Sequence, residues 1–183
     1  MIAILQPLVP HYRADFFDGL KKLHNIDIYT YENNKEIKKR NFKLSNNQTI
    51  YLNNFKIGSL LFYNPFPFLS SKYKVLILMG SVKHISTWLI LFLNIFLNKK
   101  IILFGHGISY TKYEKEKLNQ PFYRKLLYKM SDIGWFYTKH EERIWKNEIQ
   151  KLKCVSLNNT VSGIDRIISQ NLLDKQSRDI IKD

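Results

Sequence analysis

The chain is poor in the residues that build several common kinds of site. It holds a single cysteine among 183 residues, Cys154, which excludes an intrachain disulfide and a zinc site made of several thiolates. Cys154 falls within a predicted strand, so we interpret it as a structural residue. The lack of disulfides is typical of a reducing compartment, and we expect a cytoplasmic protein without a bound metal.

Several catalytic and nucleotide-binding motifs are also absent. The first strand is not followed by G-x-G-x-x-G, and G-x-x-x-x-G-K-[ST] occurs nowhere, which argues against NAD-dependent enzymes and P-loop NTPases. There is no G-x-S-x-G motif either. The acids Asp15, Asp18, Glu114 and Glu116 fall on predicted helices or polar loops, so no carboxylate pair for hydrolysis is evident. We predict no cofactor.

No hydrophobic run is long enough to cross a membrane. The longest candidate, residues 85–97, has 13 residues. As a helix it would span about 20 Å, against the roughly 30 Å of a bilayer core. Residues 1–6 lack a basic segment, and Pro7 and Pro10 interrupt the apolar run that follows, so no export signal is visible. We therefore predict a buried helix at residues 85–97.

Positive charge is what the chain has in excess. It carries 29 Lys and Arg against 15 Asp and Glu, a formal charge of +14. This favours an anionic partner such as phospholipid, a lipid-linked phosphate or nucleic acid. Biased residue usage explains it equally well, because lysine greatly outnumbers arginine and Asn and Ile are abundant. On the first interpretation, we expect peripheral, salt-sensitive association with the inner face of the cell membrane.

Short apolar runs alternate with helix-like segments, a pattern typical of a parallel sheet covered by crossover helices. The predicted strands are residues 2–6, 26–31, 74–79, 101–104, 133–137 and 154–157. The predicted helices are residues 13–23, 85–97, 121–130 and 139–150. We predict an α/β fold: a single Rossmann-like, doubly wound parallel sheet with helices on both faces. The domain covers residues 1–161, and residues 162–183 form a C-terminal helix or linker.

Local signals fix some of these elements. In the first helix, Phe16, Phe17, Leu20 and Leu23 share a face that we expect to pack on the sheet. Thr138 and Glu141 have capping-box spacing at the start of the last of these helices, and Ser162 with Asp165 offers a weaker cap beyond it. The prolines at 65 and 67 predict a loop over residues 64–67. Residues 32–54 are polar, with weak strand signals only.

Ligands of open α/β sheets bind outside the carboxyl ends of the strands, so the loops that follow the strands are the candidate sites. The first loop presents His11, Tyr12 and Arg13 just before a helix, a position suited to phosphate or sugar hydroxyls. The alternative is that Tyr12 packs on the sheet edge and Arg13 is a solvated first-turn residue.

The second candidate loop is Gly105, His106 and Gly107, where flanking glycines allow close backbone approach and let the imidazole project into a cleft. The alternative is a histidine bonded to a loop carbonyl. In the third loop, Gly80 and Ser81 precede a helix start that can hold an oxyanion. In the alternative, Ser81 caps the helix, and Lys83 and His84 face water.

Residues 122–130 interleave aromatic and basic side chains at helical spacing. This pattern suits a helix lying on an anionic membrane surface. It also suits an ordinary crossover helix with its apolar face on the sheet.

These segments together resemble a known family. Residues 6–13 with Phe16, Phe17 and Leu20 resemble the Y-R-x-x-F-F-x-x-L opening of bacterial polysaccharide-type GT-B glycosyltransferases. The strand that ends in Gly105-His106-Gly107, then Tyr137-Thr138, then Asn159-Thr160-Val161 are similar to that family in order and spacing. The sequence departs from it at Ser162, where an acidic residue is common, and in a first loop without glycines.

The resemblance implies the acceptor-side Rossmann-like half of an enzyme that builds lipopolysaccharide, capsule or exopolysaccharide. A second domain, with an E-x7-E-type motif and a glycine-rich loop, would bind the nucleotide-sugar and follow residue 161, so we expect no activity from this chain alone. His106 would face the cleft as the catalytic residue. A lipid-linked or saccharide acceptor would be bound by His11, Tyr12, Arg13, Gly80, Ser81, Gly105 and Gly107.

The alternative hypothesis is a non-enzymatic basic α/β module that binds anionic membrane or nucleic acid. The aromatic residues fall on predicted helix faces and form no stacking platform, and no nucleic-acid-binding motif is present. We therefore expect no nucleic-acid partner and favour the glycosyltransferase hypothesis.

Overall fold

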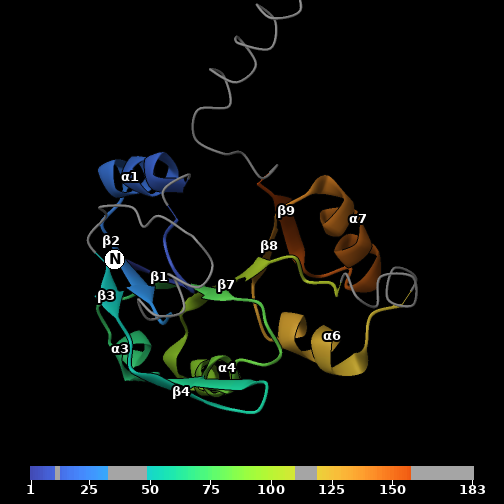
Figure 1. Ribbon diagram of the computed structural model, residues 1–183. Coiled ribbons are helices and arrows are strands. Elements are labelled where there is room, and N and C mark those ends of the chain that lie inside the picture. The colour runs from blue at the N-terminus through green and yellow to red at the C-terminus, as the bar shows by residue number, and fades with distance from the viewer. Residues whose placement is uncertain (11–12, 33–48, 110–118, 158–183) are drawn as a thin grey trace, which may run out of the picture.

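A seven-stranded, wholly parallel sheet forms the centre of the computed structural model, which describes residues 1–10, 13–32, 49–109 and 119–157 (Figure 1). The strand order is β3-β2-β1-β6-β7-β8-β9. Its members are β1 (Ile2–Gln6), β2 (Ile26–Thr30), β3 (Ile50–Tyr51), β6 (Val75–Met79), β7 (Lys100–Gly105), β8 (Ile133–Phe136) and β9 (Lys153–Ser156). The predicted α/β, Rossmann-like fold is confirmed.

The helices cover both faces of the sheet, as the strand order requires. From β1 the chain moves outward through β2 to β3, and from β6 it moves in the opposite direction to β9. Right-handed crossovers therefore place α1 (Ala14–Leu23) on one face and α4 (Ile85–Leu97), α6 (Phe122–Lys129) and α7 (Lys139–Glu148) on the other. The sheet order reverses between β1 and β6, the switch point at which such folds bind ligands.

Each face of the sheet carries its own apolar core. On the α1 side, Phe17 packs with Ile4, Ile28 and Ile77. On the other side, the alternate strand residues pack against α4, α6 and α7. This division follows from the period of two along each strand, because successive side chains point to opposite faces.

The sequence predictions missed a hairpin and a short helix. The antiparallel strands β4 (Asn54–Ile57) and β5 (Leu60–Tyr63) form a separate two-stranded sheet. Pro65 then precedes the four-residue helix α3 (Phe66–Leu69). The prediction of a loop over residues 64–67 is therefore wrong for Phe66 and Pro67, which are helical. Pro67 lies in the first turn of α3, where a proline costs no helical hydrogen bond.

Two helices bury less than their sequences predicted. In α1, Phe17 is buried, but Leu23 is 77% exposed and does not pack on the sheet. In α4, Ser86, Thr87, Ile90 and Leu91 are buried, whereas much of the apolar remainder faces outward. The prediction of a buried helix at residues 85–97 is therefore wrong for that outer face. None of the helices in the described ranges is long and apolar enough to cross a membrane.

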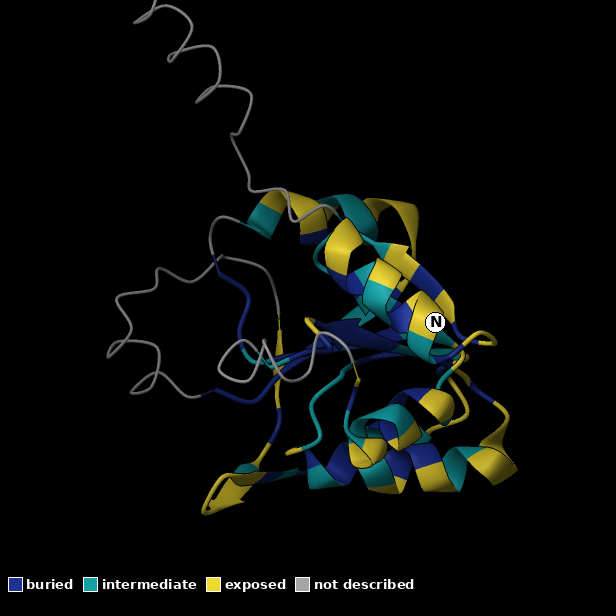
Figure 2. Cartoon of the chain, turned by 90° about the vertical axis from the view of Figure 1, so that its right-hand side faces the viewer, coloured by how far each residue is buried: buried dark blue, intermediate teal, exposed yellow. Residues whose placement is uncertain are grey.

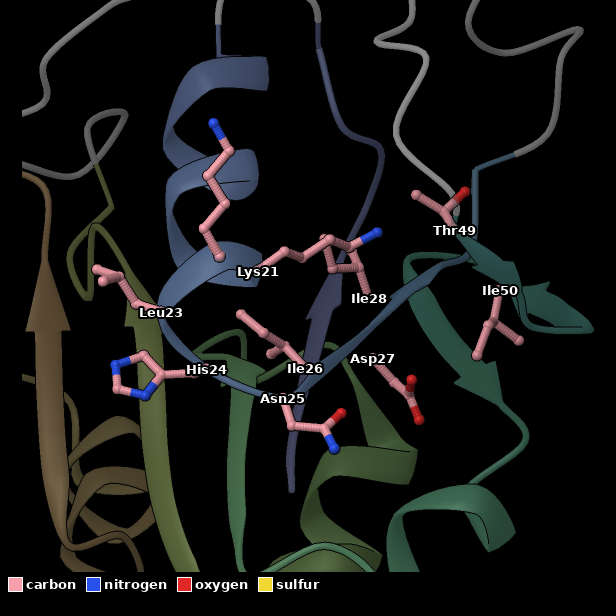
Figure 3. Close-up of a pocket in the computed structure, with 10 residues that line it drawn as sticks. Lys21, Leu23, His24, Asn25, Ile26, Asp27, Ile28, Thr49 and Ile50 are labelled. Atoms are coloured by element: carbon pink, nitrogen blue, oxygen red, sulfur yellow. The ribbon is translucent and has the colours of Figure 1, made fainter.

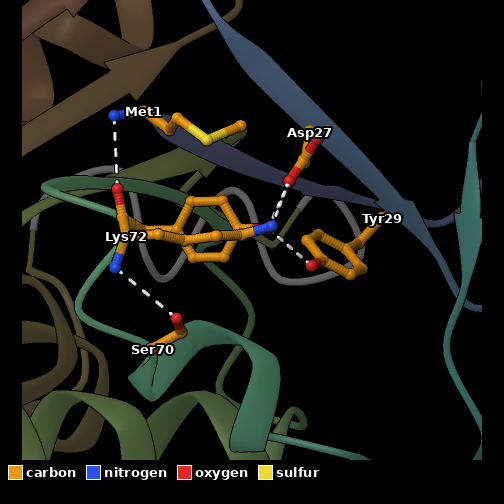
Figure 4. Close-up of polar contacts among 6 residues, drawn as sticks. Met1, Asp27, Tyr29, Ser70 and Lys72 are labelled. Carbon is orange, nitrogen blue, oxygen red and sulfur yellow. Dashed lines mark hydrogen bonds and ion pairs between the residues drawn. The ribbon is translucent and has the colours of Figure 1, made fainter.

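A polar network ties the start of β2 to the segment before β6 (Figure 4). Lys72 Nζ lies 2.9 Å from Asp27 Oδ2, the Tyr73 hydroxyl donates to the same carboxylate, and the Tyr29 and Tyr73 hydroxyl oxygens are 2.7 Å apart. Burial raises the pKa of Asp27, but the hydrogen bonds from Tyr73 and Lys72 outweigh burial and lower it below its usual value. This network stands at the amino edge of the sheet, opposite the candidate site.

Candidate functional site

The carboxyl ends of the parallel strands meet at one edge of the sheet, and two of the three predicted loops are described there. The loop after β6 holds Gly80 and Ser81, and the loop after β7 holds His106. Arg13 is the N-cap residue of α1, at the same edge. His11, Tyr12 and the Asn159-Thr160-Val161 segment lie outside the described residues.

His106 forms a hydrogen bond with an acid that the sequence predictions did not assign to the site. Its Nδ1 lies 2.7 Å from Oε1 of Glu141, whose side chain is fully buried while the imidazole is 47% exposed. The other oxygen of Glu141, Oε2, accepts the backbone N–H groups of Tyr137 and Thr138, each at 3.0 Å. The contact seen at Nδ1 is therefore to a carboxylate.

The predicted capping box explains how Glu141 reaches this position. Thr138 is the N-cap of α7, and its hydroxyl accepts the Glu141 backbone N–H, while the Glu141 side chain returns to the Thr138 backbone N–H. This reciprocal arrangement fixes the carboxylate at the helix start, where the helix dipole stabilises negative charge. The capping box is confirmed, and it also anchors the partner of His106.

The contacts of Glu141 define which nitrogen of His106 carries the proton. Two backbone N–H groups donated to a carboxylate favour its ionised form, and with Glu141 ionised, Nδ1 donates to Oε1. In the neutral imidazole the lone pair is then on Nε2, on the half-exposed ring. A carboxylate that holds a histidine in this way fixes the tautomer and stabilises the imidazolium formed when Nε2 takes up a proton.

Tyr137 connects His106 to Arg13. The rings of Tyr137 and His106 have centroids 4.3 Å apart, and the Arg13 guanidinium carbon lies 4.9 Å from the Tyr137 ring centroid. Both distances are within the range of favourable ring contacts. Arg13 and His106 come from loops far apart in the sequence, and the structure places them on the same tyrosine.

Two of the predicted site glycines are required by packing in the structure. A β-carbon on Gly107 would lie 2.5 Å from Nε1 of Trp145, and the φ of Gly107 is +68°. A β-carbon on Gly80 would collide with the Tyr128 hydroxyl. Gly105 also has a positive φ, +149°, but packing does not require a glycine there, since its β-carbon would meet nothing closer than 4.0 Å. The backbone at residues 80 and 107 therefore packs directly against side chains of α6 and α7.

The loop after β6 differs from its prediction. Helix α4 begins at Ile85 with His84 as N-cap, so Ser81 does not cap it. Lys83 faces water as predicted, but His84 is only 7% exposed and the prediction that it faces water is wrong. Its ring packs edge-on against Tyr31 and Tyr63, with Nε2 3.4 Å from the Tyr31 hydroxyl oxygen.

We expect His84 to make the protein less stable as pH falls from about 6.5 to about 4. Burial disfavours its imidazolium and lowers the pKa of His84 from 6.5 to about 4. Within that window the unfolded chain binds a proton that the folded chain excludes, so the free energy of unfolding rises with pH. The full difference is about 3 kcal/mol, measurable by urea unfolding at a series of pH values.

The variant His84→Gln should flatten that part of the profile. His24→Gln is the matched control, because His24 is exposed at the end of α1 and its replacement should leave the slope unchanged. A slope that is the same in wild type and His84→Gln would contradict the assignment.

An open depression of about 900 Å³ lies away from this cluster (Figure 3). Its lining comes from the end of α1 and the starts of β2 and β3, including Lys21, His24, Asp27 and Thr49. These segments form the amino edge of β2, opposite the carboxyl edge that holds His106. Among the described residues there is no cluster of three His, Cys, Asp or Glu side chains that would hold a metal ion.

Comparisons with known proteins identify no family for this chain. No protein-family model matches the chain, and no curated protein matches it. Among solved structures, it is similar to the UDP-GlcNAc 2-epimerase from Methanocaldococcus jannaschii, with a TM-score of 0.49 and 13% sequence identity. The match covers 85% of this chain and 45% of the epimerase, so the chain spans less than half the length of that protein. A likeness this distant carries no inference about activity, and what is established is an α/β Rossmann-like domain.

Proposed function

We propose that this domain holds the acceptor during sugar transfer in a GT-B-type glycosyltransferase of surface polysaccharide synthesis. The acceptor is a lipid-linked or saccharide molecule, and the nucleotide-sugar is bound by a second unit. The observation that carries the proposal is the 2.7 Å contact between His106 Nδ1 and the fully buried Glu141. It stands at the carboxyl edge of the sheet, where α/β folds bind their ligands.

The pair supplies the chemistry that this transfer needs. Nε2 of His106 takes the proton of an acceptor hydroxyl while that oxygen bonds to the anomeric carbon and the bond to the nucleoside diphosphate breaks. Glu141 stabilises the imidazolium that forms, because its carboxylate is held by two backbone N–H groups. Holding the hydroxyl beside the base also removes part of the entropic barrier.

Arg13 is the group best placed for an acceptor phosphate. Its guanidinium is permanently charged and lies over Tyr137, next to His106. Guanidinium groups bind phosphate through paired, charge-assisted hydrogen bonds. A lipid-linked acceptor would place its phosphate at Arg13 and its reacting hydroxyl at His106.

The isolated chain should bind an acceptor phosphate and no nucleotide-sugar. We expect calorimetry with UDP- and GDP-sugars to show no heat, whereas a short-chain polyprenyl phosphate should bind. Arg13→Ala should weaken that binding at least about tenfold, from the loss of one charged contact. Arg143→Ala is the control, because Arg143 is an exposed arginine on α7.

Micromolar binding of a nucleotide-sugar would contradict the proposal that a second unit, and not this chain, binds the nucleotide-sugar. Equal phosphate affinity in wild type and Arg13→Ala would remove Arg13 from the site. Binding of nucleic acid in preference to the polyprenyl phosphate would favour the alternative of a basic binding module.

A further inference from the structure

We propose that the outer face of α4 and the β4–β5 hairpin dock on an anionic phospholipid surface. We call it the outer apolar face, and it consists of Phe55, Ile57, Leu89, Phe92, Ile95 and Phe96. All six side chains are exposed, Phe96 by 78% and Ile57 by 62%. This inference is independent of the acceptor site and concerns where the domain resides.

Helix α4 buries two polar residues and exposes a stripe of apolar ones, unlike an ordinary surface helix. Ser86 and Thr87 face inward with Ile90 and Leu91, whereas Phe92 and Phe96 face outward. Helices of soluble proteins normally turn their polar residues toward water and their apolar stripe toward the core. An outward apolar stripe of this size marks an interaction surface.

The inward polar residues explain why the stripe points outward. Ser86 Oγ donates to the Tyr63 carbonyl at 2.6 Å and accepts the Tyr63 N–H at 2.9 Å. Thr87 Oγ1 lies 2.8 Å from the Tyr63 hydroxyl oxygen. These bonds fix the rotation of α4 and attach it to β5, the second strand of the hairpin that carries Phe55 and Ile57. Figure 2 shows exposed residues on the hairpin and along α4.

The elements that form the face carry charged side chains of one sign only. Residues 37–113 contain no Asp or Glu, so no acidic side chain comes from the hairpin, α3, α4 or the strands that join them. Lys56 lies between Phe55 and Ile57 on the hairpin, and Lys83 precedes α4; both are exposed. Apolar side chains flanked by lysines match the acyl and headgroup layers of an anionic leaflet.

This charge pattern also argues against a second copy of the chain as the occupant. Two copies joined through this face would bring Lys56 and Lys83 toward their like-charged counterparts, in a protein that already carries +14. An anionic bilayer offers apolar contact and charge complementarity together. Because α4 has only 13 residues, it would lie in the interface and not span the membrane.

Helix α6, whose sequence suggested membrane contact, is the weaker candidate. It exposes Phe122 and Tyr123, but Lys125 Nζ is paired with Glu148 at 2.7 Å. Its buried Leu127 and Tyr128 belong to the core, as in an ordinary crossover helix. The acid beside α6 makes its surroundings less favourable for anionic lipid than those of α4.

The test is co-sedimentation of the full chain with vesicles of phosphatidylcholine alone or mixed with phosphatidylglycerol. We expect binding to the mixed vesicles only, and release when salt rises from about 0.05 M to about 0.5 M. Phe92→Ser/Phe96→Ser should lower the affinity at least about tenfold. Lys56→Glu/Lys83→Glu should lower it as well, and it leaves every apolar side chain in place.

Leu23→Ser is the matched control, because Leu23 is as exposed as Phe96 but lies on α1, across the sheet. Circular dichroism melts should show that all the variants fold. The proposal is overturned by equal binding of wild type and both double variants, by equal binding to neutral vesicles, or by absence of binding at low salt. It is also overturned by a dimer in sedimentation velocity that Phe92→Ser/Phe96→Ser abolishes. None of these results bears on Arg13 or His106.

Discussion

Replacing His106 with alanine is expected to lower the rate of sugar transfer by about 10- to 1000-fold once a donor-binding unit is present. The buried Glu141 holds the imidazole of His106 in place. The alanine variant lacks this imidazole, which both takes up the proton and positions the hydroxyl of the sugar acceptor. The loss should fall mainly on kcat, because the proton moves in the transition state. The measurement uses this chain fused to, or expressed with, the donor-binding domain of a GT-B relative.

Two further variants make this experiment specific. Glu141→Gln keeps the size of the side chain but removes the charge that stabilises the imidazolium, so it should lower kcat in the same direction as His106→Ala. His140→Ala removes an exposed histidine next to Glu141 in the sequence and should leave the rate unchanged. If His106→Ala stays within about twofold of wild type, the histidine is structural and the proposed site is wrong.

The sheet was predictable from the sequence because its strands are short apolar runs with clear ends. Residues 2–6 form β1 as predicted, and the run ending at Met79 forms β6. A central parallel strand is buried on both faces, so its sequence is continuously apolar. The two glycines that flank His106 marked the end of the next strand.

The partner of His106 was not predictable, although Glu141 was recognised. The spacing of Thr138 and Glu141 identified a helix cap from local sequence alone. The contact between Glu141 and His106 joins residues 35 positions apart, and it depends on how β7 and β8 pair in register. A capping glutamate uses one carboxylate oxygen for the cap, and only the fold determines what its second oxygen meets.

The hairpin and the outer face of α4 were also missed, although the sequence carries a signal for each. Gly58 and Ser59 separate two strand-like segments, a known two-residue turn signal, and Gly58 has the positive φ of +57° that such turns use. In α4, apolar residues occur on all sides of the helix, so the sequence pattern did not indicate which side is exposed. The only sequence signal was the pair Ser86 and Thr87, whose burial requires a polar partner that Tyr63 supplies.

Gly107→Ala should lower the free energy of unfolding by about 2–4 kcal/mol. Its φ of +68° costs an L-residue about 1 kcal/mol, and the new methyl group would press on Trp145 and Phe136 at 2.5 and 2.7 Å for about 1–3 kcal/mol more. Both rings are fully buried and belong to the core that holds α6 and α7, so neither can move without disturbing that core.

Urea unfolding measures the effect of Gly107→Ala, and Gly19→Ala is its control. Gly19 lies within α1 with nothing within 4 Å of a β-carbon, so alanine there should stabilise the protein by up to about 1 kcal/mol. The opposite signs separate local crowding from any general effect of adding a methyl group. Equal stability of wild type and Gly107→Ala would mean that the loop after β7 can move away from Trp145. Gly107 would then be available for ligand approach, and the packing explanation given for it would be wrong.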